Sequence, residues 1–151
     1  AGGWTMFPEV MERIMRLSVE AVNDPNPDRI RTRLEFLMHD NSLVHDDLVE
    51  VRRAIYSQPG FIEVMQAILC LQEPEIRQRN MFTYEDSAEI TAPTLVLWTS
   101  HDPTASPEEG QKIADSIPGA QFSVMNECGH WPQFEDPLVF NKLHLDFLLD
   151  R

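Results

Sequence analysis

The chain has 151 residues, enough for one domain or for a small module and part of another. Acidic residues outnumber basic ones by 25 to 12, and the formal net charge of −13 argues against nucleic acid or an anionic membrane as a partner. No apolar run reaches the length of a membrane span. Cys70 and Cys128 are too few for a disulfide framework, and no Cys and His set has zinc spacing. We therefore expect reduced thiols in a cytoplasmic protein that uses no metal or cofactor.

The first half of the chain predicts short amphipathic helices. One helix covers residues 8–17. An Asn-Asp-Pro-Asn-Pro stretch then interrupts the pattern, with Asn26 as the N-cap and Pro27 as the first residue of a second helix, which should end near residues 39–41. The apolar stripe of this second helix consists of Ile30, Leu34, Leu37 and Met38.

Two further helices are predicted before the pattern changes. The third covers residues 46–56, and we expect it to bury Leu48, Val51 and Ile55. The fourth begins near Phe61. No strand pattern lies between these helices, and the sequence has no internal repeat.

From about Glu75 the chain reads as alternating strands and helices. Residues 94–98 form a continuous apolar run, typical of a strand that is covered on both faces. A helix follows, with Ser106 as its N-cap, Pro107 at its first position and Glu109 completing a capping box. This helix should stop at the next Pro-Gly pair.

Residues 121–125 alternate polar and apolar side chains and predict a second strand. A right-handed crossover makes the two strands parallel, so their carboxyl ends lie at the same edge of the sheet. We therefore expect Asp102, after the first strand, and His130, after the second, to be neighbours. The last helix starts at an Asp-Pro pair, and its inward side chains should be Phe140, Leu143, Phe147 and Leu148.

An aspartate that holds an imidazole is two-thirds of a hydrolytic triad. The simpler interpretation is a turn residue before Pro103 for Asp102 and a loop histidine satisfied by backbone groups for His130. We expect Cys128 to be inert packing. The other histidines should be structural or exposed: His39, His45, His101 and His144.

Two strands do not make an independently stable sheet, and a strand as apolar as residues 94–98 requires a neighbouring strand on each of its edges. We therefore expect further strands upstream of residue 1, which makes the chain one piece of a larger α/β domain.

The stretch Thr-Leu-Val-Leu-Trp-Thr-Ser-His-Asp that ends at Asp102, and Cys-Gly-His-Trp-Pro-Gln-Phe-Glu at residues 128–135, resemble the C-terminal half of α/β hydrolases. The Gly-His-Trp sequence and the helix after it are similar to meta-cleavage product hydrolases. These enzymes hydrolyse a carbon–carbon bond in 2-hydroxy-6-oxo-2,4-dienoates, the ring-opened products of aromatic catabolism. By this resemblance, residues 1–74 form a helical lid and residues 75–151 the C-terminal part of the α/β-hydrolase core.

The resemblance also implies roles for single residues. Asp102 and His130 would be the triad acid and base. The stretch Asp-Asp-Leu-Val-Glu-Val-Arg matches the lid segment of the family, and its Arg52 would bind the dienoate carboxylate or the oxyanion that develops at the adjacent oxygen. The simpler interpretation of Arg52 and Arg53 is a solvated helix face rich in carboxylates. Trp131 would line the pocket, with a core aromatic as the alternative. Leu37 is a candidate substrate contact, although its place in an apolar stripe favours the core.

One departure from the family is large. The family nucleophile lies in a Gly-x-Ser-x-Gly elbow, and the sequence contains no such elbow. We expect the serine on an N-terminal portion of the same enzyme, which would be a partner of this chain in a homo-oligomeric protein. Two alternatives remain: another α/β-hydrolase activity, such as esterase, epoxide hydrolase or haloalkane dehalogenase, and a non-catalytic interaction module. An exposed strand edge, which promotes aggregation, argues against the module.

Overall fold

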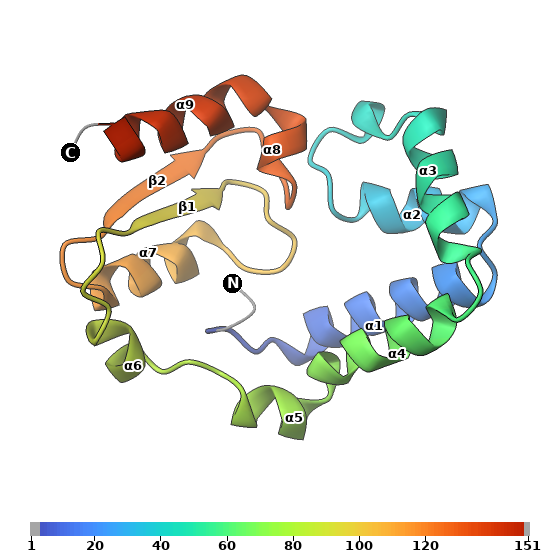
Figure 1. The fold of residues 1–151 in the computed structure, drawn as a ribbon, viewed down its shortest axis with the longest axis horizontal. Coiled ribbons are helices and arrows are strands. Elements are labelled where there is room, and N and C mark those ends of the chain that lie inside the picture. Colours follow the sequence, from blue (N-terminus) through green and yellow to red (C-terminus); the bar gives the residue numbers. More distant parts are fainter. Residues whose placement is uncertain (1–3, 150–151) are drawn as a thin grey trace. The chain divides into compact units, whose positions relative to one another are not determined.

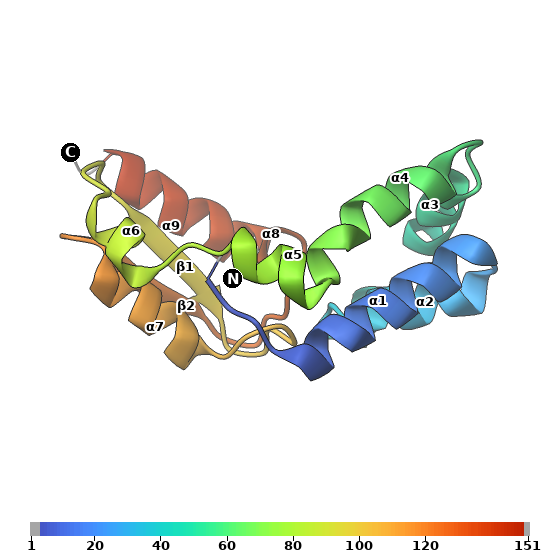
Figure 2. The ribbon, with the colours of Figure 1, turned by 90° about the horizontal axis from the view of Figure 1, so that it is seen from below.

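The computed structural model of the chain describes residues 4–149. The chain forms two compact units. Figures 1 and 2 show their helices and strands, coloured along the sequence. The helical unit comprises residues 6–37 and 41–80, and the sheet unit comprises residues 4–5, 38–40 and 81–149. In the part of the chain that is described, no helix combines the length and apolar character that a membrane span requires.

The helical unit contains α1 (Pro8–Asn23), α2 (Pro27–Glu35), α3 (Asp46–Tyr56), α4 (Phe61–Leu69) and α5 (Pro74–Arg79). Short 3₁₀ turns lie at Asn41–Leu43 and Cys70–Gln72. Helices α2 and α4 both pack against α1, and α3 packs against α2 (Figure 1). Buried hydrophobic side chains on these elements include Met11, Leu17, Ala21, Val22, Ile30, Leu34, Val49, Tyr56 and Leu69.

The start of α2 follows the predicted local chemistry. The side-chain oxygen of Asn26 accepts a hydrogen bond of 3.0 Å from the backbone N–H of Arg29, and Pro27 occupies the first helical position. The predicted end near residues 39–41 is wrong, because α2 ends at Glu35. The backbone N–H of His39 donates to the carboxylate of Glu135, 2.8 Å away, instead of continuing the helix.

The buried face of α3 also differs from the prediction. Val49 and Tyr56, which lie two helical turns apart, are the buried residues of this helix. Leu48 and Ile55 border this face and are half-buried, whereas Val51 is 59 % exposed. The apolar stripe correctly predicts a helix, but it does not identify the face of the helix that is buried.

The sheet unit contains two parallel strands, β1 (Leu95–Thr99) and β2 (Gln121–Met125), paired from Leu95 with Gln121 to Thr99 with Met125. The predicted parallel arrangement is confirmed. The connecting helix α7 (Pro107–Ser116) packs on both strands. The unit also contains α6 (Tyr84–Ala88), α8 (Pro132–Glu135) and α9 (Pro137–Leu149). Both ribbon views place α7 and α9 on opposite sides of the strands (Figures 1 and 2).

Helix α7 begins as predicted, with Ser106 as its N-cap and Pro107 at its first position. The predicted capping box is wrong. The hydroxyl of Ser106 makes no capping bond to the helix but bonds the Glu108 side chain, and this bond lowers the pKa of Glu108. Glu109 pairs with Lys112 one turn later, at 2.5 Å, and does not reach back to the N-cap.

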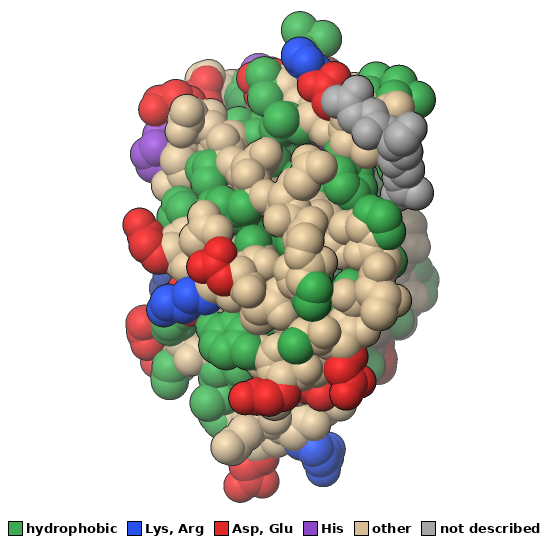
Figure 3. Space-filling view, turned by 90° about the vertical axis from the view of Figure 1, so that its left-hand side faces the viewer, with side chains coloured by type: hydrophobic (Ala, Val, Ile, Leu, Met, Phe, Trp, Pro, Cys, Tyr) green, Lys and Arg blue, Asp and Glu red, His purple; other side chains and the backbone are tan. Residues whose placement is uncertain are grey.

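Helix α9 presents a large apolar surface to solvent. Phe140, Leu143 and Phe147 are half-buried as expected, but Leu148 is 55 % exposed, against the prediction that it points inward. The exposed apolar residues of this helix are Leu138, Val139, Leu145, Leu148 and Leu149. Figure 3 shows one side of the molecule, where hydrophobic side chains reach the surface between acidic ones. Within the described residues the sheet has two strands, so each strand has an unpaired outer edge.

The contact between β1 and α7 requires a glycine. A Cβ atom added to Gly110 would lie 2.5 Å from Cδ2 of Trp98, whose indole is 8 % exposed and held in place. We expect Gly110→Ala to lower the free energy of unfolding by about 1–3 kcal/mol, because overpacking outweighs the better helix propensity of alanine. Denaturant unfolding measures this change. Gln111→Ala, at the next and exposed position, is the matched control, and equal stability of the two variants would contradict the packing described here.

Candidate active site

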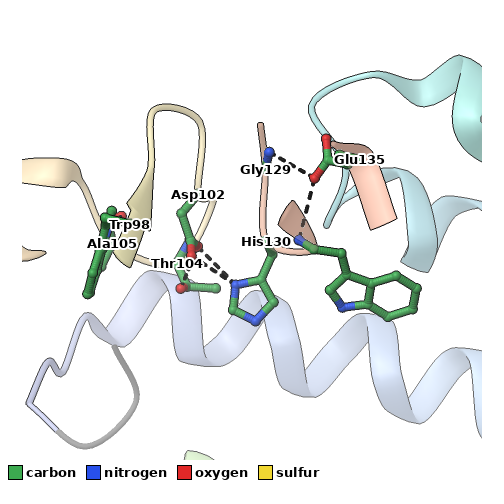
Figure 4. Close-up of polar contacts among 8 residues, drawn as sticks. Trp98, Asp102, Thr104, Ala105, Gly129, His130 and Glu135 are labelled. Atoms are coloured by element: carbon green, nitrogen blue, oxygen red, sulfur yellow. Dashed lines mark hydrogen bonds and ion pairs between the residues drawn. The ribbon is translucent and has the colours of Figure 1, made fainter. Parts of the chain in front are cut away.

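The candidate site lies at the carboxyl ends of β1 and β2, where two loops meet. The loop after β1 carries Asp102, and the loop after β2 carries His130. The Nδ1 atom of His130 lies 3.0 Å from Oδ2 and 3.1 Å from Oδ1 of Asp102 (Figure 4). The two side chains that are 28 positions apart in sequence are therefore in direct contact.

Asp102 is held in place by its own loop as well. Its Oδ1 accepts hydrogen bonds from the backbone N–H of Thr104 at 2.8 Å and from the Thr104 hydroxyl at 2.6 Å. Its side chain is 14 % exposed, compared with 39 % for His130. Burial, the largest single influence, favours the neutral acid, but the interactions with His130 and Thr104 together outweigh it. The pKa of Asp102 is consequently below its usual value, and the carboxylate is charged at neutral pH.

Two sets of backbone contacts join the loops to each other and to the sheet. The N–H of Ser100 donates to the carbonyl of Met125 at 2.9 Å, and the N–H of His101 donates to the carbonyl of Cys128 at 2.9 Å. The strand pairing thus continues past β1 up to the residue before Asp102. Beneath this loop, the indole N–H of Trp98 donates to the carbonyl of Ala105 at 3.0 Å (Figure 4).

The loop of His130 is shaped by Glu135 of α8. Its Oε1 accepts from the backbone N–H of Gly129 at 2.8 Å and from that of Trp131 at 3.4 Å, so the two amides that flank His130 share one carboxylate oxygen (Figure 4). Its other oxygen, Oε2, accepts from the N–H of His39. Sequence reasoning missed this role. The available signal was an acid four positions after Trp131, in a helix that Pro132 opens.

Cys128 precedes this loop and is 1 % exposed. Burial raises the pKa of its thiol, and the nearby carboxylates of Glu135, Asp136 and Glu127 raise it further. A thiol with a raised pKa is a poor nucleophile, so the contacts give Cys128 a packing function.

A hollow of about 130 Å³ opens beside the Asp102–His130 pair. Thr99 contributes a buried hydroxyl that has no hydrogen-bond partner among the described residues. Trp131 is half-buried and meets the ring of Phe134 edge-on, with 6.3 Å between the ring centroids. The side chains that line the hollow are Leu97, Trp98, Thr99, Asp102, His130 and Pro132.

The other two predicted site residues belong to the helical unit. Arg52 of α3 is half-buried, with its guanidinium 5.7 Å from the ring centroid of Tyr56. Arg53 points elsewhere and pairs with Glu50 at 2.7 Å. Leu37 is 6 % exposed, as expected of a core residue.

Arg33 is a second, deeper arginine of the same unit that sequence reasoning did not single out. Its Nε donates to the hydroxyl of Ser18 at 3.1 Å, whereas its Nη1 is buried without a hydrogen-bond partner in the described part of the chain. Burial lowers the pKa of Arg33, the Tyr56 hydroxyl opposes this change, and the charge of Arg52 adds to it.

Comparison with known proteins extends these observations. Residues 8–137 match the family model described as the alpha/beta hydrolase fold. The chain is 31 % identical over 147 residues to a 2-hydroxy-6-oxononadienedioate/2-hydroxy-6-oxononatrienedioate hydrolase of Comamonas testosteroni, covering 97 % of this chain and 50 % of the relative. It is 33 % identical over 148 residues to a 2-hydroxy-6-oxo-6-phenylhexa-2,4-dienoate hydrolase of Burkholderia cepacia, with the same coverage.

A solved structure gives the same result. A meta-cleavage product hydrolase from Pseudomonas fluorescens IP01 superposes with a TM-score of 0.74 at 28 % identity, covering 83 % of this chain and 46 % of that one. The chain spans about half the length of the curated relatives it matches. The resemblance to meta-cleavage product hydrolases is confirmed at this level, and the chain belongs to the α/β-hydrolase fold family.

Proposed function

We propose that this chain supplies the lid and the acid–base pair of a serine-type hydrolase that cleaves a carbon–carbon bond in 2-hydroxy-6-oxo-2,4-dienoates. The observation that carries the proposal is the contact between Asp102 and His130 at the carboxyl edge of the sheet. Relatives that are named for this reaction, and that match nearly the whole chain, support it.

In this proposal His130 is the general base and Asp102 holds it. The carboxylate accepts the Nδ1 proton, which fixes the tautomer whose Nε2 can take a proton, and it stabilises the imidazolium once formed. Figure 4 shows the other ring nitrogen of His130 directed away from Asp102. The depressed pKa of Asp102 keeps this partner negatively charged over the neutral pH range.

The nucleophile would come from a serine outside these 151 residues. The sequence has no Gly-x-Ser-x-Gly elbow, and the described sheet has two strands with unpaired edges. The remaining strands of the α/β-hydrolase sheet would pair with these edges and cover the leucines that α9 exposes. We propose this N-terminal portion as the partner of the chain, within a cytoplasmic homo-oligomer.

The reaction would proceed in two stages. The dienol first ketonises, and His130 moves the proton. The serine, or a water that the serine assists, then attacks the distal carbonyl. The bond between that carbonyl carbon and its neighbour breaks, and the carbon that leaves is protonated to give a 2-hydroxydienoate. If the serine attacked, a water then hydrolyses the acyl-serine ester; by either route one water is consumed and a carboxylic acid is released.

Substrate binding would use Arg52 and Trp131. A guanidinium suits the dienoate carboxylate because its donors form a planar fork that matches the two carboxylate oxygens. The Trp131 ring would pack on the planar diene. Leu37, which is buried, would shape the lid from within rather than contact the substrate.

The acid–base pair predicts a specific kinetic pattern. In the active protein, His130→Ala should lower kcat by about 10²–10⁴-fold, the usual contribution of a positioned general base. Asp102→Asn should cause a comparable loss, and the double variant should not multiply the two losses, because the side chains act as one unit. Steady-state kinetics measure this, with His144→Ala as the matched histidine control. Wild-type turnover in the His130 variant would contradict the assignment.

The proposed carboxylate contact predicts substrate-dependent losses. Arg52→Gln should lower kcat/KM for a dienoate about 10–100-fold, the loss that corresponds to one hydrogen bond between charged groups. Hydrolysis of the neutral ester p-nitrophenyl acetate should change far less. Arg53→Gln is the control and should leave both rates nearly unchanged, because Arg53 pairs with Glu50 on an exposed helix face. Equal losses on both substrates would give Arg52 a structural role.

The proposed origin of the nucleophile is testable by covalent labelling. A fluorophosphonate should inactivate the active protein, and peptide mapping should place the label on a serine in a peptide absent from this sequence. The label should disappear in His130→Ala protein, which lacks the base that activates serine. Labelling of a serine of this chain would overturn the proposal; Ser100, whose hydroxyl lies 2.8 Å from Nδ1 of His101, is the one to inspect.

A further inference from the structure

Three side chains that the proposed reaction does not use converge on one spot of the sheet unit. His39 comes from the segment Met38–Asp40, His101 from the loop after β1, and Glu127 from the turn after β2. One ligand-type atom from each residue lies within 4.8 Å of the others. Nε2 of His39 is 3.2 Å from Oε2 of Glu127, and the two imidazole rings stack with 3.8 Å between their centroids.

We propose that His39, His101 and Glu127 bind one divalent transition-metal ion of the zinc class. Two imidazoles and one carboxylate are a usual set of three protein ligands for zinc, with the fourth position left to water. The separation of 3.2 Å between the His39 nitrogen and the Glu127 oxygen is slightly shorter than the ~3.3–3.6 Å between two ligands at about 2.0–2.2 Å from a tetrahedral ion, so a small shift would accommodate the ion. Because the rings of His39 and His101 are stacked, His101 has to change rotamer and leave the stack to complete the set.

The backbones of the three residues are already held in position. The N–H of His39 donates to Glu135, and the N–H of His101 donates to the carbonyl of Cys128, the residue after Glu127. Glu127 itself has a φ of 53°, a left-handed conformation that a glutamate rarely adopts, and this conformation directs its side chain. The ordering that a metal site demands is therefore supplied by the fold, and only side-chain rotamers remain to adjust.

The second ring nitrogen of His101 also has a suitable partner. Its Nδ1 lies 2.8 Å from the hydroxyl of Ser100, which leaves Nε2 for the ion. Metal-binding histidines usually place their other nitrogen against an oxygen in this way, because the contact fixes the ring orientation. The side chains of His39 and Glu127 are 29 % and 81 % exposed, so an ion can reach the site from solvent.

The ligand chemistry selects the kind of ion. Imidazole nitrogen favours Zn²⁺, Co²⁺, Ni²⁺ and Cu²⁺, whereas Ca²⁺ and Mg²⁺ prefer sites made only of oxygen. Two neutral imidazoles and one carboxylate carry a single negative charge, which a divalent ion more than neutralises. The bound ion would join the two loops next to Asp102 and His130, so it would stabilise the folded protein.

The test uses tag-free protein and Zn²⁺ in a buffer that does not chelate it. Isothermal titration calorimetry should show one saturable site per chain for Zn²⁺ and none for Mg²⁺. Saturating Zn²⁺ should raise the melting temperature. Replacing Zn²⁺ by Co²⁺ should give a visible ligand-field spectrum that reports nitrogen and oxygen donors, a readout independent of catalysis.

The variants separate this site from other metal binding. His39→Ala and His101→Ala should each weaken Zn²⁺ binding at least about tenfold. His45→Ala, an exposed histidine of the helical unit, is the matched control and should bind as the unaltered protein does. If an alanine variant is poorly folded by circular dichroism, His39→Gln and His101→Asn replace it. Absence of a saturable Zn²⁺ site, or an affinity unchanged in both histidine variants, would overturn the proposal and leave an ion pair beside two stacked rings.

Discussion

The candidate site depends on the parallel pairing of β1 and β2. A parallel pair places the carboxyl ends of both strands at one edge, and here the register brings Thr99 level with Met125. The hydrogen bonds from Ser100 and His101 to the second loop extend that pairing by two residues. Asp102 directly follows His101, and His130 lies two residues after Cys128, so the hydrogen bond between His101 and Cys128 brings Asp102 and His130 together. Once the strands are in register, the two loops need only these local hydrogen bonds to place Asp102 beside His130.

Carboxylates then fix the local shape of both loops. Asp102 accepts two hydrogen bonds from Thr104 in addition to its contact with His130, and Glu135 accepts backbone N–H groups on both sides of His130. Hydrogen bonds to charged groups contribute about 1.5–3 kcal/mol each, more than those between neutral groups. These bonds hold the two catalytic candidates in place from opposite sides, and Trp98 supports the Asp102 loop from below.

The features that the sequence predicts well are those that depend on nearby residues or on chain handedness. The cap at Asn26 and the parallel arrangement of the strands are of this kind. The prediction of the buried side of α3 is wrong because it relies on the regular stripe of Leu48, Val51 and Ile55. The face that is buried in the helical unit is instead that of Val49 and Tyr56. The cluster of His39, His101 and Glu127 joins three distant parts of the chain, and no spacing rule reveals it. A contact role for Arg52 comes from resemblance alone, because periodicity does not distinguish it from Arg53.

The contacts of Glu135 bear on which substitutions the loop that carries His130 can accept. The carboxylate binds main-chain N–H groups of Gly129 and Trp131, and these groups are the same whatever side chain the residue carries. Replacing the indole at residue 131 therefore changes the side chain that follows His130 without removing the bonds that shape its loop. Residue 131 can therefore vary while the backbone around His130 keeps its shape. The loop separates the part that must stay constant from the part that can diversify.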